Sequence, residues 1–171
     1  MITLITGGVK SGKSHYALET AAKWGFPVSF IATAEVLDNE MKDRITRHRT
    51  ERAEFAGTEA GFVTIEEPLE LDAAMVKAGN RAVVDCLPMW VNNMIFYERE
   101  ADFDIILDAF IKSMQKKENC VVVTNETGLG NIPFDEMTRR YNRLLAESNR
   151  KIAAAADSVQ LMVSGIPLRI K

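Results

Sequence analysis

Apolar residues along this chain fall into short unbroken runs that alternate with longer segments of helical spacing. The runs at residues 2–6, 28–32, 81–87, 120–124 and 159–163 predict buried strands, and 62–65 and 166–170 predict two more. Helical spacing covers 13–24, 36–52, 69–78, 103–116 and 134–156, and a helical stretch rich in Met and Trp begins at Pro88. This alternation indicates an α/β fold with a mostly parallel sheet and helices on both faces.

Composition narrows the class of protein. The 171 residues, 47 % of them hydrophobic, suit one globular domain over residues 1–171. The net charge of −3 gives no basic field for nucleic acid, and no apolar run reaches the roughly 20 residues that cross a bilayer. The amino terminus lacks the basic flank of a secretory signal. Cys86 and Cys120 adjoin apolar segments, which predicts two buried free thiols in a reducing compartment. We therefore expect a cytoplasmic protein.

A glycine-rich segment joins the first predicted strand to the first predicted helix and matches G-x-x-x-x-G-K-[ST]. Its glycines let the backbone wrap a phosphate, while loop amides and the helix amino terminus point at the anion. We expect Lys13 to act catalytically on the β- and γ-phosphates and Ser14 to bind Mg²⁺. The predicted nucleotide-binding residues of this P-loop are Gly7, Gly8, Val9, Lys10, Ser11, Gly12, Lys13 and Ser14.

Asp85 follows the apolar strand residues 82–84 and is the second predicted metal residue. In P-loop folds an acidic residue at this strand end sits beside Mg²⁺, usually through water. An ordinary strand-end aspartate is the alternative. Residues 124–127, Thr-Asn-Glu-Thr, occupy a comparable strand end but do not match the Asn-Lys-x-Asp element that reads guanine in switch GTPases. A regulatory GTPase is therefore not expected.

A histidine stands among arginines at residues 44–52. If this segment is helical, Arg44, His48 and Arg52 lie on one face. Neighbouring cations disfavour protonation of the ring, and guanidinium groups clamp phosphates. A neutral His48 in this setting is able to attack an α-phosphorus and form a nucleotidyl-histidine. The alternative is a solvated helix with His48 as a bystander, and His15 reads as structural.

Taken together, these motifs identify a family. The chain resembles the bifunctional adenosylcobinamide kinase/adenosylcobinamide-phosphate guanylyltransferase family essentially from end to end. The resemblance is carried by residues 6–14, 30–33, 37–41, 44–48, 123–133, 153–157 and 163–167. Of these, the Thr-Asn-Glu-x-Gly-x-Gly-x-x-Pro stretch at 124–133 and the segment around His48 are the most specific.

The resemblance implies a RecA-like P-loop NTPase fold, a homotrimer and two reactions. A nucleoside triphosphate phosphorylates adenosylcobinamide, and GMP from GTP is then transferred to the product through a phosphoramidate on His48. The substrates are adenosylcobinamide, GTP and ATP, with Mg²⁺ as cofactor. The family's further nucleotide contacts fall on Ala32, Thr33, Ala34, Arg49, Thr50, Glu51, Arg52, Glu66 and Asp85.

Two positions depart from the family pattern. Members can carry His where Arg47 stands and Glu where Asp85 stands, so this chain has one nucleophile candidate in the segment and a shorter carboxylate. Two other functions compete with the family function. One is a small-molecule P-loop kinase without nucleotidyltransferase activity, which needs no covalent histidine. The other is a nucleotide-dependent regulatory or scaffolding protein, which would not turn over cobinamide.

Overall fold

The described strands form one seven-stranded sheet. The computed structural model describes residues 1–35, 39–56, 61–130 and 132–171. The strand order is β3-β2-β4-β5-β1-β6-β7, and all neighbours are parallel except β7, which is antiparallel to β6. The strands are β1 (Ile2–Gly7), β2 (Val28–Ala32), β3 (Phe62–Glu66), β4 (Arg81–Asp85), β5 (Asn119–Val123), β6 (Ser158–Val163) and β7 (Ile166–Arg169). The predicted α/β fold with a mostly parallel sheet is confirmed.

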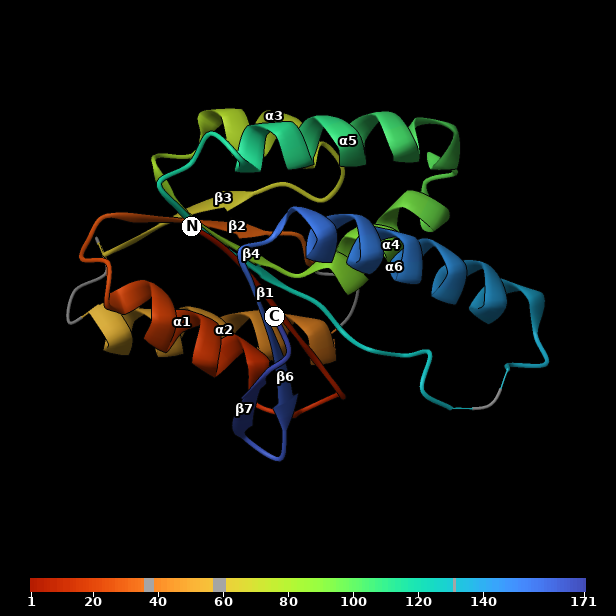
Figure 1. Cartoon of the computed structure of the whole chain (residues 1–171), viewed down its shortest axis with the longest axis horizontal. Helices are drawn as coiled ribbons and strands as arrows, with labels where there is room; N and C mark the ends of the chain where they lie inside the picture. Colours follow the sequence, from red (N-terminus) through yellow and green to blue (C-terminus); the bar gives the residue numbers. More distant parts are fainter. Residues whose placement is uncertain (36–38, 57–60, 131) are drawn as a thin grey trace.

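Helices cover both faces of this sheet (Figure 1). On one face lie α1 (Lys13–Ala22) and α2 (Asn39–Ala56). On the other lie α3 (Leu71–Lys77), α4 (Leu87–Phe96), α5 (Phe103–Met114) and α6 (Glu136–Ala155), and a short 3-10 turn (Glu100–Asp102) precedes α5. None of the helices in the described part of the chain is long and apolar enough to cross a membrane.

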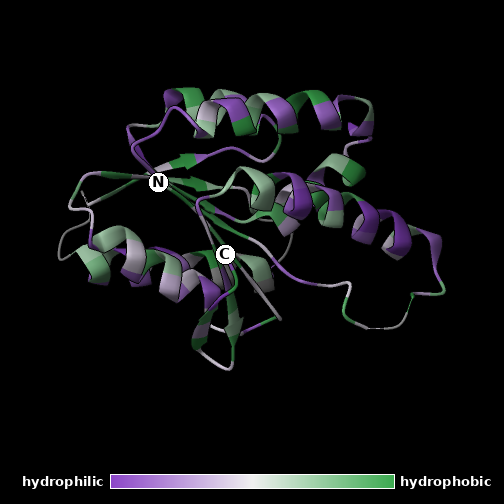
Figure 2. Cartoon of the chain, in the orientation of Figure 1, coloured by the Kyte–Doolittle hydropathy of each residue, from purple (hydrophilic) through white to green (hydrophobic). Residues whose placement is uncertain are grey.

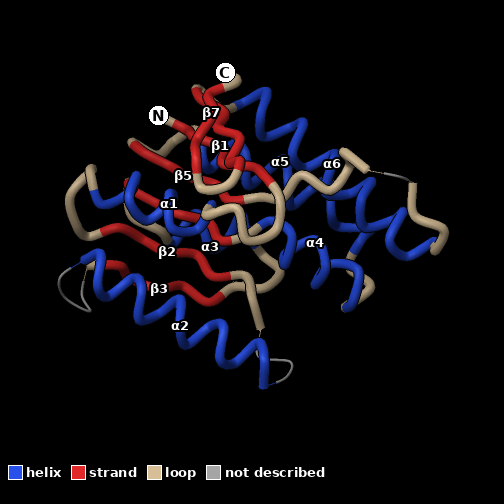
Figure 3. Tube along the Cα trace, turned by 90° about the horizontal axis from the view of Figure 1, so that it is seen from below, coloured by secondary structure: helices blue, strands red, loops and turns tan. Residues whose placement is uncertain are grey.

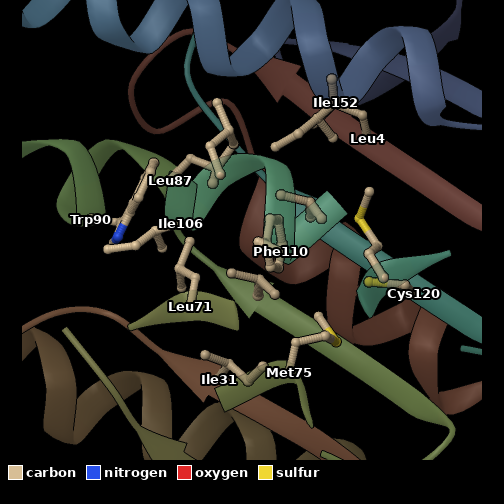
Figure 4. Packing of buried hydrophobic residues seen from close by; sticks show 14 of the residues in the cluster. Leu4, Ile31, Leu71, Met75, Leu87, Trp90, Ile106, Phe110, Cys120 and Ile152 are labelled. Atoms are coloured by element: carbon tan, nitrogen blue, oxygen red, sulfur yellow. The ribbon is translucent and has the colours of Figure 1, made fainter. Parts of the chain in front are cut away.

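Alternate residues of each central strand enter the two cores, which is why these strands are apolar throughout. Leu4, Val84 and Val122 pack under α3 to α6, whereas Ile5 and Val83 pack under α1 and α2. Figure 2 shows the resulting hydrophobic strands at the centre of the molecule, and Figure 4 shows the larger core around Trp90 and Phe110.

Helix boundaries differ from the prediction by a few residues for local reasons. The predicted helix at 134–156 begins two residues later because Asp135 caps it, with its carboxylate accepting from the Thr138 amide at 2.7 Å. Helix α2 continues to Ala56, four residues past the prediction, and the predicted residues 36–38 lie outside the described residues. Of the two cysteines, only Cys120 is buried as predicted; Cys86 is half-buried.

Candidate nucleotide-binding and active site

The glycine-rich loop between β1 and α1 has the backbone conformation that its glycines predict. Gly7 and Gly12 have φ angles of 146° and 91°, which side chains disfavour. At Gly7 a Cβ would also lie 2.5 Å from the carbonyl oxygen of Met162 on the neighbouring strand β6. The turn of the β6–β7 hairpin supports the loop from this side, since the Gly165 amide donates to the Ser11 carbonyl at 3.1 Å.

Lys13 directs its ammonium group into this loop. The residue is buried, and its Nζ donates to the Gly8 carbonyl and lies 3.4 Å from the Ser11 hydroxyl. The ammonium therefore lies within the turn whose amides are expected to hold phosphate. Ser14 follows in the first turn of α1 and is half-buried. The loop thus places a cation and a hydroxyl at the start of one helix.

A cavity of about 320 Å³ lies under α2, at the carboxyl ends of β2, β3 and β4. His48 and Asp85 face each other across it, with Nδ1 of the imidazole 3.9 Å from Oδ2 of the carboxylate. Their side chains are 25 % and 10 % exposed, so both are shielded yet reachable. The described residues that line the cavity are Phe30, Ala32, Ala34, Glu35, Met41, Ile45, His48, Arg49, Arg52, Glu66, Glu67, Pro68, Asp85, Cys86 and Met89. Figure 3 shows α2 running along β2 and β3.

Two arginines of α2 bring positive charge to this cavity. Arg52 is buried, and its guanidinium carbon lies 4.1 Å from the centroid of the Phe30 ring. Burial lowers the pKa of Arg52, and the nearby Asp85 carboxylate opposes that shift. Arginine still keeps its charge at neutral pH. Arg49, one residue after His48, forms an ion pair with Glu66.

A buried hydrogen-bond network holds the strand ends that form the cavity floor. The Thr33 hydroxyl donates to the Cys86 carbonyl at 2.7 Å and accepts from the Cys86 amide at 2.9 Å. The Asn93 side-chain amide on α4 donates to the carbonyls of Thr33, at 2.8 Å, and Pro68, at 3.1 Å. Asn93 therefore ties together the segments that follow β2 and β3, and Thr33 ties β2 to β4.

Replacing Asn93 by leucine should lower the free energy of unfolding by about 2 kcal/mol, because the buried Thr33 carbonyl loses its side-chain donor. The adjacent Asn92 is exposed, so Asn92→Ala is a matched control expected to stay within about 0.5 kcal/mol of the parent. Urea denaturation of both variants measures the difference. Equal midpoints for the two variants would contradict the structural role assigned to Asn93.

The structure brings some predicted site residues together and leaves others apart. Seven of them line the cavity: Ala32, Ala34, His48, Arg49, Arg52, Glu66 and Asp85. The P-loop residues do not line it, nor do Thr33, Thr50 and Glu51. The side chain of Arg44, predicted on the face of His48 and Arg52, lies outside the described residues. His15 packs its ring edge-on against Phe55 of α2 at 4.9 Å, in keeping with a structural role.

Comparison with known proteins identifies the family. The model of the family described as cobinamide kinase / cobinamide phosphate guanyltransferase matches residues 3–170. This chain belongs to that family. It is 37 % identical over 175 residues to the bifunctional adenosylcobalamin biosynthesis protein CobP of Pseudomonas aeruginosa, covering 100 % of this chain and 98 % of that protein. It is 33 % identical over 185 residues to CobU of Escherichia coli, with both chains fully covered.

Solved structures confirm the predicted fold of this cobinamide kinase family member. The flagellar accessory protein FlaH from Methanocaldococcus jannaschii aligns with a TM-score of 0.57 at 12 % identity, over 99 % of this chain and 77 % of that one. The RadB recombinase aligns with a TM-score of 0.53 at 14 % identity, over 94 % and 73 %. At such identities the likeness concerns the RecA-like P-loop fold alone.

Sequence reasoning missed several residues of this family member's site. Asn93 lies in an apolar helical run and gives no local signal of its contacts. Cys86 lines the cavity although its apolar surroundings predicted a buried thiol. Glu67 also lines the cavity, and its carboxylate accepts from the amides of Leu69 and Glu70. Only the fold reveals the roles of Asn93 and Cys86, because both bond to segments distant in sequence, whereas the Glu67 carboxylate bonds within its own turn.

Proposed function

We propose that this chain carries out both reactions that its family's description names. A nucleoside triphosphate bound at the P-loop phosphorylates the amino-alcohol hydroxyl of adenosylcobinamide. GMP from GTP is then joined to the phosphorylated product, giving adenosyl-GDP-cobinamide and pyrophosphate. The observation that carries this proposal is that a complete P-loop and a shielded histidine lie at the same carboxyl edge of one sheet.

The cavity chemistry supports His48 as the carrier of GMP. An imidazole nitrogen that attacks the α-phosphorus forms a P–N bond, and the α–β bridging oxygen leaves with pyrophosphate. The phosphate of the cobinamide then attacks the same phosphorus and releases the imidazole. Arg49 and Arg52 follow His48 on α2 by one and four residues, line the same cavity, and supply positive charge for the phosphate oxygens in both steps.

We further propose that Mg²⁺ is held by Ser14 and Asp85. Both are oxygen donors, which suit Mg²⁺, and Mg²⁺ commonly binds through one or two protein ligands together with substrate phosphates and water. Ser14 is in the first turn after the P-loop, and Asp85 ends β4, which β5 separates from β1. Bound there, the ion would neutralise charge on the triphosphate.

Replacing Asp85 by asparagine should impair the Mg²⁺-dependent steps more than metal-free nucleotide binding, because a neutral amide is a weaker ligand of Mg²⁺. Turnover titrated with Mg²⁺ should show a half-saturating concentration raised by about tenfold or more. Calorimetry with GTP in the absence of metal supplies the comparison. If the Mg²⁺ titrations of variant and parent coincide, Asp85 is not a metal ligand, and its role is to stabilise the fold or to influence His48.

The family resemblance also suggests a homotrimer, and we propose this assembly. Support comes from the exposed apolar side chains at the edge of the sheet, since such patches mark contacts between proteins. These are Val163, Ile166, Leu168 and Ile170 of the β6–β7 region. The partners in solution would be adenosylcobinamide, ATP and GTP in the cytoplasm, with no nucleic acid.

One experiment tests the proposed function against its rivals. The purified protein is incubated with α-labelled GTP and examined for acid-labile label, then supplied with adenosylcobinamide and ATP. Label on the protein that moves to a corrinoid product supports the proposal. A simple P-loop kinase would phosphorylate adenosylcobinamide without taking up label, and a regulatory protein would not turn over cobinamide.

A further inference from the structure

The segment after strand β5 places the backbone of a glutamate, Glu126, next to the P-loop. This strand lies between β4 and β1, so its carboxyl end emerges between Asp85 and the phosphate loop. The Thr124 amide donates to the Ile5 carbonyl at 2.9 Å, and the Glu126 amide donates to the Gly7 carbonyl at 3.2 Å. The backbone contacts between β5 and β1 thus continue past both strands, and Glu126 lies beside the first residue of the P-loop.

A second contact fixes this segment from helix α6. Thr124 is fully buried, and its hydroxyl donates to Oδ1 of Asn149 at 2.6 Å. The Nδ2 group of Asn149 in turn donates to the Asn125 carbonyl at 2.9 Å. Residues 124–126 are therefore held by the P-loop on one side and by a long helix on the other. A side chain at 126 is placed by rigid elements, as a catalytic group requires.

The Glu126 carboxylate differs from the carboxylates that line the cavity. Those all have partners: Asp85 with His48, Glu66 with Arg49, Glu67 with the amides of Leu69 and Glu70, and Glu35 with the Tyr97 hydroxyl. Glu126 does not line that cavity, and it is half-buried. No side chain in the described parts of the chain forms an ion pair with it.

We propose that Glu126 is the general base of the phosphorylation step, an inference that rests on the proposed kinase activity. The hydroxyl oxygen of the substrate forms a bond to the γ-phosphorus, and the bond from that phosphorus to the β–γ bridging oxygen breaks. The electron pair leaves with the nucleoside diphosphate. The hydroxyl proton passes to the Glu126 carboxylate and from there to solvent. Phosphoryl transfer enzymes commonly place a carboxylate on the attacking hydroxyl in this way.

The test compares Glu126→Gln with Glu118→Gln. Glutamine keeps the size of the side chain but accepts a proton poorly, so kcat for adenosylcobinamide phosphorylation should fall by about 10²–10⁴-fold. The KM for ATP and the uptake of GMP from GTP should stay at parent values. Glu118 lies just before β5, at the opposite end of the strand, 3.8 Å from Arg81. Its substitution should leave both half-reactions unchanged.

Several outcomes would overturn this assignment. One is a Glu126→Gln protein with unchanged phosphorylation kcat, and another is recovery of kcat at high Mg²⁺, which would make Glu126 a metal ligand. An equal loss of GTP affinity, GMP uptake and phosphorylation would show a structural role, and a lowered midpoint of thermal unfolding would accompany it. If the parent itself fails to phosphorylate adenosylcobinamide, the proposed function fails and this inference with it. An active parent with an active variant removes the inference alone.

Discussion

Replacement of Lys13 by alanine should strongly reduce both phosphorylation of adenosylcobinamide and uptake of GMP while the fold persists. The ammonium group lies inside the P-loop, where it contacts the Gly8 carbonyl and the Ser11 hydroxyl. With nucleotide bound, we expect the same group to neutralise charge that grows on the phosphates during transfer. Loss of one such group from a shielded site costs about 3–4 kcal/mol in the transition state, or about 10²–10³-fold in kcat.

Calorimetry with GTP, turnover assays and thermal unfolding of Lys13→Ala measure these effects together. Lys23→Ala is the matched control, because Lys23 follows the far end of the same helix, is exposed, and forms an ion pair with Glu19 one turn back. Its removal should change stability and activity little. A folded Lys13→Ala protein that binds and turns over GTP like the parent would refute the assignment of residues 7–14 as the phosphate site.

Much of the fold was predictable because its strands are buried on both faces. In residues 82–84 and 121–123 every position is apolar, and such runs are typical of central parallel strands. The order of the strands did not follow from the sequence, since it depends on pairing across long separations. That order is what places β5, and with it Glu126, between Asp85 and the P-loop.

The site was predictable where its residues are consecutive. The P-loop is read from eight adjacent residues, and Gly7 and Gly12 have the positive φ angles that its glycines predict. His48 and Asp85 are 37 positions apart in the sequence, and only the packing of α2 against the sheet brings them together. Asn93 shows the limit most clearly, because an amide within an apolar helix reveals its partners only in three dimensions.

Replacing His48 by asparagine should abolish guanylylation and leave much of the phosphorylation intact. Asparagine keeps polarity and approximate size but has no ring nitrogen that can form a stable P–N bond. Loss of a covalent nucleophile lowers turnover by a factor on the order of 10⁴ or more. In the proposed kinase step the γ-phosphoryl group passes directly between the substrates, so we expect this step not to need the imidazole.

Two features of the structure sharpen this expectation. His48 lines a cavity with Arg49 and Arg52 but not with the P-loop residues, so its substitution should disturb triphosphate binding at residues 7–14 little. Oδ2 of Asp85 lies 3.9 Å from Nδ1, beyond hydrogen-bond distance, so the substitution removes no hydrogen bond from the predicted metal residue. The P–N bond also conserves much of the energy of the α–β phosphoanhydride, which lets the second half-reaction proceed readily with a phosphate nucleophile.

Intact-protein mass spectrometry after incubation with GTP gives the decisive measurement. The parent should gain the mass of GMP, and His48→Asn should not. His15→Asn is the matched control, because His15 is the only other histidine in the sequence and packs against Phe55 outside the cavity; that variant should be labelled like the parent. Label on His48→Asn, together with formation of adenosyl-GDP-cobinamide, would show that GMP is transferred directly or through another residue. Label lost only in His15→Asn would assign the nucleophile to helix α1 instead.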